Sequence, residues 1–214
     1  MELKDSETLK NLTRSFAAEC QDGAKYQYMA DEATGQKQQY VATILKQLAT
    51  NEMAHAKVFY DYISQNAQVQ DLVVDIKASY PMSHAPLIEM LKIKAELEKK
   101  QAETVYPAFA RMAQKEGFNQ VADYFEEIAK IEAEHAMVLF ELYNKMANKN
   151  LYSSNNAILY KCTNCGYTEK IKKAWKKCPL CTKDQGMVKI NLDCSGKDCH
   201  CVSNEINKSE KVKK

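Results

Sequence analysis

Two copies of a Glu-x-x-His motif stand 80 residues apart in this chain of 214 residues. The first copy holds Glu52 and His55, and the second holds Glu132 and His135. A spacing of three residues puts the acid and the imidazole on one face of a helix, one turn apart. Carboxylate oxygens and imidazole nitrogens are ligands for divalent metals such as iron. The two motifs therefore indicate a metal site inside a helical protein.

Two further glutamates, Glu19 and Glu98, lie in the middle of otherwise apolar helical stripes. An ionised carboxylate inside a helix bundle is costly unless it is paired or binds a metal. One glutamate from each of two helices, plus Glu-x-x-His from each of two others, is the ligand set of di-iron carboxylate bundles. The alternative is four unrelated acids and two structural histidines. This alternative is disfavoured because all four apolar stripes carry an acid in their middle.

Four cysteines follow the pattern Cys-x2-Cys, twelve residues, Cys-x2-Cys; they are Cys162, Cys165, Cys178 and Cys181. Two such knuckles place four thiolates around one tetrahedral metal, which would be iron or zinc. The surrounding segment of roughly 35 residues is too short for an unaided core. We therefore expect the metal to hold the fold of this segment as well.

The bundle ligands can meet only if four long helices carry them to one level. Gly35 and Gly117 mark short turns, which make the helices on either side antiparallel neighbours. Glu19 lies 16 residues before Gly35 and Glu52 lies 17 after it, so the two are almost level at about 1.5 Å per residue. The stretch 65–86 is long enough to cross the bundle. The predicted fold is all-α, a ferritin-like four-helix bundle followed by a small metal-bound module.

Charge divides the chain near residue 150. Residues 1–148 hold 16 Lys+Arg and 22 Asp+Glu, a net charge of −6, whereas the rest holds 14 Lys and 6 acids, a net charge of +8. We assign 1–148 to the bundle, 149–157 to a linker, 158–192 to the four-cysteine module and 193–214 to a polar tail. A basic half can suggest nucleic acid, but here it can dock on the acidic half, and we expect no nucleic-acid partner.

Composition excludes several other classes. Hydrophobic residues make up 45% of the chain and charged residues 27%, as in an ordinary globular protein. No stretch approaches the roughly 20 apolar residues of a membrane-spanning helix, so no membrane partner is expected. The charged first ten residues are not typical of a signal peptide. Eight cysteines in such a chain favour a reducing cytoplasm.

The motifs together resemble those of the rubrerythrin family. The bundle carries them as SFAAEC, NEMAHAKVF, ETVYPAFARMAQKEGF and IEAEHAMVLF, and the module carries Cys-Gly-Tyr and Cys-Pro-x-Cys, as rubredoxin does. The resemblance covers residues 5–192. It implies two non-haem irons in a ferritin-like bundle and one iron bound by four cysteine thiolates in a rubredoxin-like domain.

The resemblance also implies a function. The protein would be a peroxidase that reduces hydrogen peroxide to water and protects against oxidative stress. Its electrons would come from an external donor, a reductase or a rubredoxin-like carrier, through the four-cysteine iron. It would work as a homodimer or a larger homo-oligomer.

Three bundle positions are interpreted through this resemblance. Tyr26 and Tyr106 match tyrosines that hydrogen-bond to the ligand glutamates in the family, although they could equally be ordinary buried aromatics. The family motif Glu-x-x-Glu is here Glu98-x-x-Gln101. In the family, the second glutamate exchanges with a histidine, here His55, as the iron changes oxidation state. An amide is a poor substitute for that carboxylate, so we expect His55 to stay bound in both states.

Two other functions remain open from the sequence. A ferroxidase would oxidise ferrous ion with oxygen and would not need the thiolate centre. A non-catalytic metal-binding or sensor protein would carry zinc in the cysteine module and would take up no electrons. The tail adds Cys194, Cys199, His200 and Cys201, which could bind a metal, form a disulfide or be incidental thiols.

Overall fold

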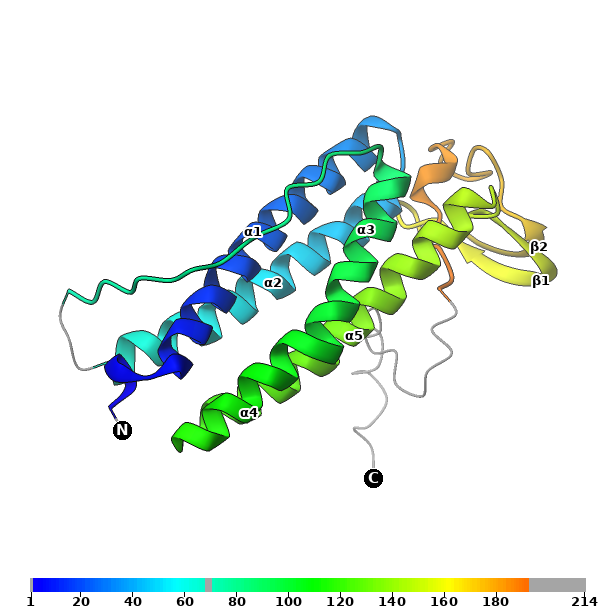
Figure 1. Cartoon of the computed structure of the whole chain (residues 1–214). Coiled ribbons are helices and arrows are strands. Elements are labelled where there is room, and N and C mark those ends of the chain that lie inside the picture. Colours follow the sequence, from blue (N-terminus) through cyan, green and yellow to red (C-terminus); the bar gives the residue numbers. More distant parts are fainter. Residues whose placement is uncertain (1, 68–70, 193–214) are drawn as a thin grey trace, which may run out of the picture.

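The computed structural model describes residues 2–67 and 71–192. Long helices dominate this part of the chain: α1 Glu7–Gly35, α2 Gln39–Asn66, α3 Leu87–Lys100, α4 Tyr106–Glu116 and α5 Asn119–Ala147. Figure 1 shows α1 beside α2, and α3 continued by α4 in one rod beside α5. The arrangement is a bundle of four rods, which confirms the predicted fold class. None of the described helices is long and apolar enough to cross a membrane.

Local signals in the sequence set the ends of the helices. The Ser6 hydroxyl accepts a hydrogen bond from the Leu9 backbone N–H at 3.0 Å and caps α1. Gly117 ends α4 with a φ of +87°, a left-handed value that glycine adopts without strain. Both helix hairpins turn within a few residues, so the rods of each hairpin run antiparallel.

The chain passes from one hairpin to the other through residues 71–86, which form no helix or strand. In Figure 1 this crossover runs along α1 from the end of α2 to the start of α3. Three hydrogen bonds tie it to α1: Arg14 Nε donates to Lys77 O at 3.2 Å, the Tyr80 hydroxyl donates to Arg14 O at 3.0 Å, and Lys25 Nζ donates to Pro81 O at 3.0 Å. This is the long connection predicted for residues 65–86.

One element differs from the sequence prediction. The sequence predicts one long helix here, but a π-helical segment, η2 Gln101–Val105, separates α3 from α4. The Tyr106 backbone N–H donates to Gln101 O, five residues back. Pro107 then falls in the first turn of α4, where a missing N–H costs least.

The π segment accounts for an irregular spacing in the sequence. Tyr26 follows Glu19 by seven residues, whereas Tyr106 follows Glu98 by eight. In an α-helix at about 100° per residue, eight residues would leave the tyrosine about 80° away from the acid's face. A π turn accommodates one extra residue. Both tyrosines therefore face the bundle interior.

The bundle interior has an apolar cluster on each side of a polar middle layer. The cluster toward the α1–α2 turn includes Leu45, Leu91 and Leu139. The cluster toward the α4–α5 turn includes Leu12, Phe59 and Phe125. Buried apolar surface stabilises a fold by about 25 cal/mol per Å². These two clusters therefore offset the cost of the charges buried between them.

The C-terminal module contains two antiparallel strands, β1 Ser153–Lys161 and β2 Thr168–Lys173, followed by a 3-10 turn, η3 Gln185–Met187. Its own core is small and centres on Tyr160, Ala174 and Val188. The strand β1 begins inside the segment that the sequence assigns to the linker. The domain boundaries themselves stay a prediction.

The module packs on the end of the bundle at the α1–α2 turn (Figure 1). The Tyr152 hydroxyl donates to Gln38 Oε1 at 2.5 Å. A methyl group at Gly186 would come within 1.8 Å of Lys37 O, so a side chain does not fit there. Leu151 and Ile190 join the apolar cluster at this end of the bundle. Module and bundle are thus in direct contact within one chain.

Candidate metal centres

Four glutamates, one from each rod of the bundle, occupy the polar middle layer. They are Glu19 on α1, Glu52 on α2, Glu98 on α3 and Glu132 on α5, and each is at most 1% exposed. Ligand atoms of Glu19, Glu52, His55 and Glu132 all lie within 4.8 Å of one another. This group holds three of the four acids that the helical stripes predict, and one of the two histidines.

The two histidines of the layer aim the same ring nitrogen at these acids. His55 Nδ1 lies 3.0 Å from Glu132 Oε1, 3.3 Å from Glu52 Oε2 and 3.5 Å from Glu19 Oε2. His135 Nδ1 lies 3.0 Å from Glu52 Oε1 and 3.0 Å from Glu132 Oε2. One nitrogen carries at most one proton and cannot donate to all of these oxygens. A metal ion could bind the nitrogens and the oxygens together.

Each glutamate also has one buried oxygen that accepts no hydrogen bond from the described part of the chain: Glu19 Oε2, Glu52 Oε1, Glu98 Oε2 and Glu132 Oε1. Buried polar atoms without a hydrogen bond are rare in folded proteins. Two divalent ions would bind such oxygens and would neutralise four carboxylates. The donor set of this layer therefore fits a di-iron centre.

The crowding of negative charge is visible in the pKa values of the acids. Burial raises the pKa of Glu19 well above its usual range, and the neighbouring glutamates add repulsion. Burial also raises the pKa of Glu98 to about 8, despite the nearby ammonium of Lys94. Burial opposes the charge of Glu52 as well, but the attraction of the two adjacent imidazoles outweighs it and lowers that pKa.

The histidines show the opposite effect. Burial alone would lower the pKa of each, but the surrounding carboxylates raise it to about 12 for His55 and to about 10 for His135. A metal takes the neutral form of imidazole, so metal binding here must release protons. Metal affinity at this site is therefore expected to rise with pH.

A tyrosine from each half of the bundle donates a hydrogen bond to a glutamate of the other half. The Tyr26 hydroxyl donates to Glu98 Oε1, and the Tyr106 hydroxyl donates to Glu19 Oε1. Both tyrosines are buried. Each hydrogen bond fixes one carboxylate oxygen and leaves the other available to a metal. This is the arrangement that the sequence resemblance implied.

Sequence reasoning missed one charged residue beside this layer, Lys94. It is 1% exposed, and its Nζ lies 2.8 Å from Glu98 Oε1 and 2.9 Å from Asp22 Oδ1. Burial alone would lower the pKa of Lys94, but the attraction of both carboxylates raises it. A signal was available, because Lys94 precedes Glu98 by four residues and Asp22 follows Glu19 by three, which places each on its ligand's helix face.

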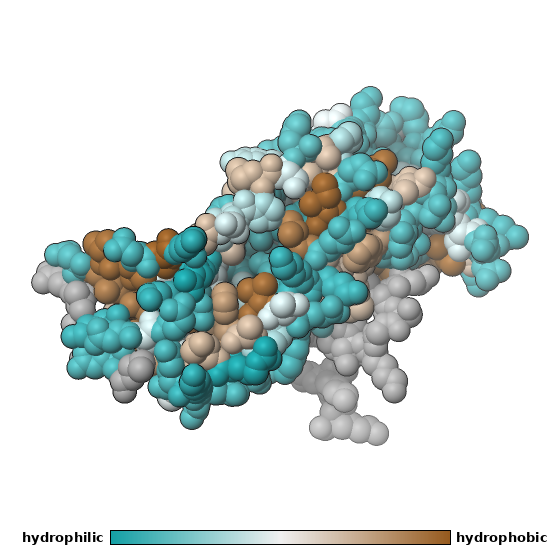
Figure 2. Space-filling model, viewed as in Figure 1, coloured by the Kyte–Doolittle hydropathy of each residue, from teal (hydrophilic) through white to brown (hydrophobic). Residues whose placement is uncertain are grey.

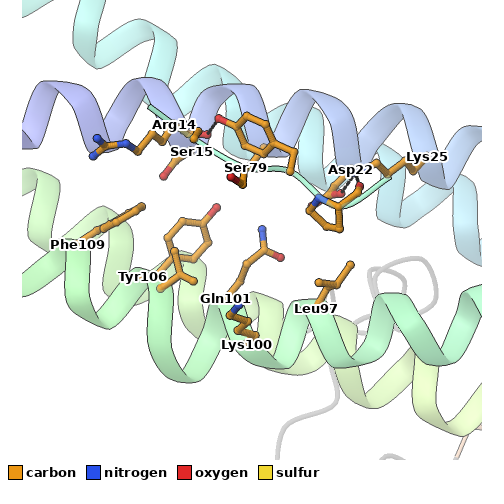
Figure 3. A pocket seen from close by; sticks show the side chains of 15 residues that line it. Arg14, Ser15, Asp22, Lys25, Ser79, Leu97, Lys100, Gln101, Tyr106 and Phe109 are labelled. Carbon is orange, nitrogen blue, oxygen red and sulfur yellow. Dashed lines mark hydrogen bonds and ion pairs between the residues drawn. The ribbon is translucent and has the colours of Figure 1, made fainter. Parts of the chain in front are cut away.

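Gln101 stands where the family motif has its second glutamate. Its side chain lines a pocket between the α3–α4 rod, α1 and the crossover (Figure 3). Its Oε1 is buried and accepts no hydrogen bond from the described residues. The expectation that His55 stays bound in both iron oxidation states remains a prediction.

The four cysteines of the module form a second cluster. The Cys162 and Cys181 sulfurs lie 3.7 Å apart, the Cys165 and Cys178 sulfurs lie 3.6 Å apart, and all four are within 4.8 Å of one another. The backbone N–H of Lys183 lowers the pKa of Cys181 to about 6. A thiolate is the form that binds a metal. The cluster fits a rubredoxin-like iron site.

The two cysteine knuckles share one backbone feature. The residue after the second cysteine has a left-handed φ in each, +78° at Gly166 and +58° at Thr182. The sequence indicated a tight turn at Gly166, whereas nothing in the residue type marks Thr182. The candidate tail ligands Cys194, Cys199, His200 and Cys201 lie outside the described residues.

A four-rod bundle that gathers four glutamates and two histidines, joined to a four-thiolate module, defines a class of protein with a di-iron carboxylate centre and a rubredoxin-like domain. The family model for rubrerythrin matches residues 10–117 and 89–163. The chain is 33% identical to rubrerythrin of Clostridium perfringens over 189 residues, which cover 88% of this chain and 96% of that protein. It is also 33% identical to rubrerythrin of Porphyromonas gingivalis over 184 residues, 86% and 89% of the two chains. The chain belongs to the rubrerythrin family.

Solved structures agree with this assignment. Nigerythrin in a partially reduced state matches with a TM-score of 0.56 and 25% identity, over 87% of this chain and 90% of that one. The fully reduced, all-ferrous state of nigerythrin matches with a TM-score of 0.55 and the same identity and coverage. The predicted ferritin-like bundle with a rubredoxin-like module is thereby confirmed.

Proposed function

We propose that the protein is a peroxidase that reduces hydrogen peroxide to water at the bundle centre. The reaction breaks the O–O bond and consumes two electrons and two protons per peroxide, giving two molecules of water. A di-iron centre, when bound, supplies one electron per ferrous ion. The observation that carries the proposal is one buried layer with ligands for two metals, in a chain that also holds a four-thiolate site.

The residues of the layer would prepare the site for this reaction. Tyr26 and Tyr106 hold one oxygen of Glu98 and one of Glu19, so each acid presents its other oxygen in a fixed direction. The apolar clusters on both sides exclude bulk water, and electrostatic contacts strengthen where water is excluded. The tyrosine hydroxyls are also the buried O–H donors closest to the ligand oxygens.

Electrons would reach the centre from an external donor through the four-cysteine iron. The module contacts the α1–α2 turn, and Glu52 lies 13 residues into α2 from Gln39, or about 20 Å along the helix axis. Within one chain the two centres are thus well separated, which favours delivery from the module of a second copy in a homo-oligomer. The acidic bundle and the Lys-rich module (9 Lys and 2 acids in residues 149–192) favour such a contact.

We place this activity in the cytoplasm, as a defence against oxidative stress. The four module cysteines form no disulfide with one another, and reduced cysteines persist in a reducing compartment. Secretion into an oxidising compartment, detected by fractionation of cells, would contradict this location.

Metal counting combined with the visible spectrum tests the proposed function. The full chain loaded with iron should hold two irons in the bundle and one in the module. Hydrogen peroxide added to the anaerobic, reduced protein should restore the thiolate–iron bands within one turnover. A chain that reacts with oxygen but not with peroxide would instead be a ferroxidase. A colourless chain with zinc at the cysteines would be a non-catalytic metal-binding protein.

A further inference from the structure

A pocket of about 270 Å³ lies beside the metal layer, between α1, the crossover and the α3–α4 rod (Figure 3). Its lining includes Tyr106, whose hydroxyl donates to Glu19, and Asp22, which pairs with Lys94. Both residues also belong to the interactions that surround the candidate ligands. The pocket therefore opens next to the metal centre.

Much of the lining is apolar. The pocket is bounded by Ala18, Leu97, Val105 and Phe109 from the helices and by Ala78 and Pro81 from the crossover. Figure 2 shows apolar side chains along the furrow between the crossover and the α3–α4 rod, with hydrophilic side chains on either side. A water molecule takes about 30 Å³ in the liquid, and hydrogen peroxide is only slightly larger. The volume of the pocket is therefore several times the volume of a hydrogen peroxide molecule.

Two polar atoms in the lining accept no hydrogen bond from the described residues, Ser15 Oγ and Gln101 Oε1. Ser15 is 2% exposed. In Figure 3 the Gln101 amide and the Tyr106 hydroxyl reach from the α3–α4 rod toward α1. An amide oxygen only accepts hydrogen bonds. Its complement in a ligand is therefore a hydrogen-bond donor such as an O–H group.

The charges at the rim favour an uncharged ligand. Arg14 lies 2.6 Å from Glu7 Oε1, and Lys25 lies 3.3 Å from Asp22 Oδ1. Arg14 and Lys25 are thus already paired, and the third cation of the lining, Lys100, is an exposed side chain, so the buried part of the pocket offers little to a carboxylate on a ligand. A hydrocarbon group with one O–H matches the lining better than an anion does.

We propose that this pocket binds small, uncharged organic hydroperoxides. The hydrocarbon group would contact Leu97 and Phe109, and the hydroperoxyl O–H would donate to Gln101 Oε1. The inference rests on the proposed peroxidase function and extends its substrate class. Reduction breaks the O–O bond of ROOH and consumes two electrons and two protons, yielding ROH and water. The electrons come from the same reduced metal centre that serves hydrogen peroxide.

Binding of an unreactive analogue tests the pocket directly. The probe is 2-phenyl-2-propanol, the alcohol formed from cumene hydroperoxide, titrated calorimetrically into the full-length, iron-loaded protein. We expect one binding site. Ala18→Phe should weaken the affinity about 10-fold by filling the pocket, and Gln101→Leu should weaken it about 5-fold by removing the acceptor. Thr43→Phe, on an exposed face of α2, is the matched control and should change nothing.

Turnover provides the second readout. Ala18→Phe should lower kcat/KM for cumene hydroperoxide about 10-fold relative to kcat/KM for hydrogen peroxide, and Thr43→Phe should leave that ratio unchanged. The pocket proposal is overturned if the alcohol does not bind, or if Ala18→Phe and Gln101→Leu both bind it like the unsubstituted protein. Alcohol binding without turnover of either peroxide would support the pocket and overturn only the proposed function.

Discussion

The two halves of the bundle, α1–α2 and α3–α5, supply matching ligands in unlike surroundings. Each half gives a glutamate from one rod, Glu-x-x-His from the other rod and a tyrosine to the acid of the opposite half. Within the described residues, the π segment, the buried Lys94 and the neutral Gln101 all belong to the α3–α5 half. The two halves thus match in their candidate ligands and differ in the residues that surround those ligands.

This difference has an electrostatic meaning. The α1–α2 half contributes the two carboxylates of Glu19 and Glu52, whereas Lys94 offsets one of the two carboxylates of the α3–α5 half. A cation close to Glu98 repels a metal ion at the same carboxylate. We therefore expect the metal position nearest Glu98 to bind its ion more weakly than the position nearest Glu19.

The largest effect should come from removing an acid that contacts both histidines. Glu52 lies 3.3 Å from His55 Nδ1 and 3.0 Å from His135 Nδ1. Glu52→Ala should therefore remove both bundle irons and abolish peroxide turnover, while the thiolate–iron bands persist. Glu98→Ala should remove about one iron, since Glu98 contacts Tyr26 and Lys94, whereas Glu52 contacts both imidazoles. Equal iron losses, measured by metal analysis, would break the comparison between the halves.

Removing the buried cation should separate stability from metal affinity. Lys94→Met leaves Glu98 buried without a cation and Asp22 with Lys25 alone, which should cost about 3–5 kcal/mol of unfolding free energy in the metal-free protein. The same change should tighten the weaker metal position by about 10-fold, since it removes one repelling charge. Chemical denaturation and anaerobic Co²⁺ titration measure the two quantities.

A double variant is the control for this experiment. Asp22→Asn together with Lys94→Met also removes the carboxylate of Asp22, which lost its closer cation, and should restore part of the lost stability. An unchanged metal affinity in both variants would show that Lys94 does not distinguish the two halves.

Stability of the metal-free protein should fall as pH rises. Glu98, with its pKa raised to about 8, keeps its proton in the folded chain at a pH where the unfolded chain has lost it. His55 and His135 likewise keep protons in the folded chain above the ordinary histidine pKa. The folded state therefore binds more protons between pH 5 and 8, and stability declines with pH over this range. Thermal melts should show a decrease of several degrees that iron loading largely removes.

The smallest effects should distinguish the two tyrosines. Tyr106→Phe leaves Glu19 Oε1 without its donor, which should cost about 1–3 kcal/mol of unfolding free energy. Tyr26→Phe should cost less, because Glu98 Oε1 keeps the ammonium of Lys94 at 2.8 Å. Denaturant titration of the two variants side by side measures the difference, and a larger loss for Tyr26→Phe would reverse this ranking.

The sequence predicts the four rods and the candidate ligands well because spacing determines both. The acids fall 15 to 19 residues from the turn glycines Gly35 and Gly117, and helix geometry places them within roughly one helical turn of a common level. Lys94 was missed because lysine is almost always exposed, and its burial depends on Asp22 from another rod. The π segment was missed because one extra residue between Glu98 and Tyr106 changes a helical pattern only slightly.

The extra residue at the junction of α3 and α4 shifts the helical phase of everything that follows. Because of this shift, Glu98 on α3 faces the metal layer, and Phe109 on α4 still faces the aromatic cluster around Phe125. Deleting Ala102 would join α3 and α4 in one straight helix and rotate α4 by about 100°. The number of residues between an acid and the tyrosine on the same rod therefore indicates whether a π turn lies between them. In any chain built on this plan, an interval of eight rather than seven should mark where a rod is locally widened.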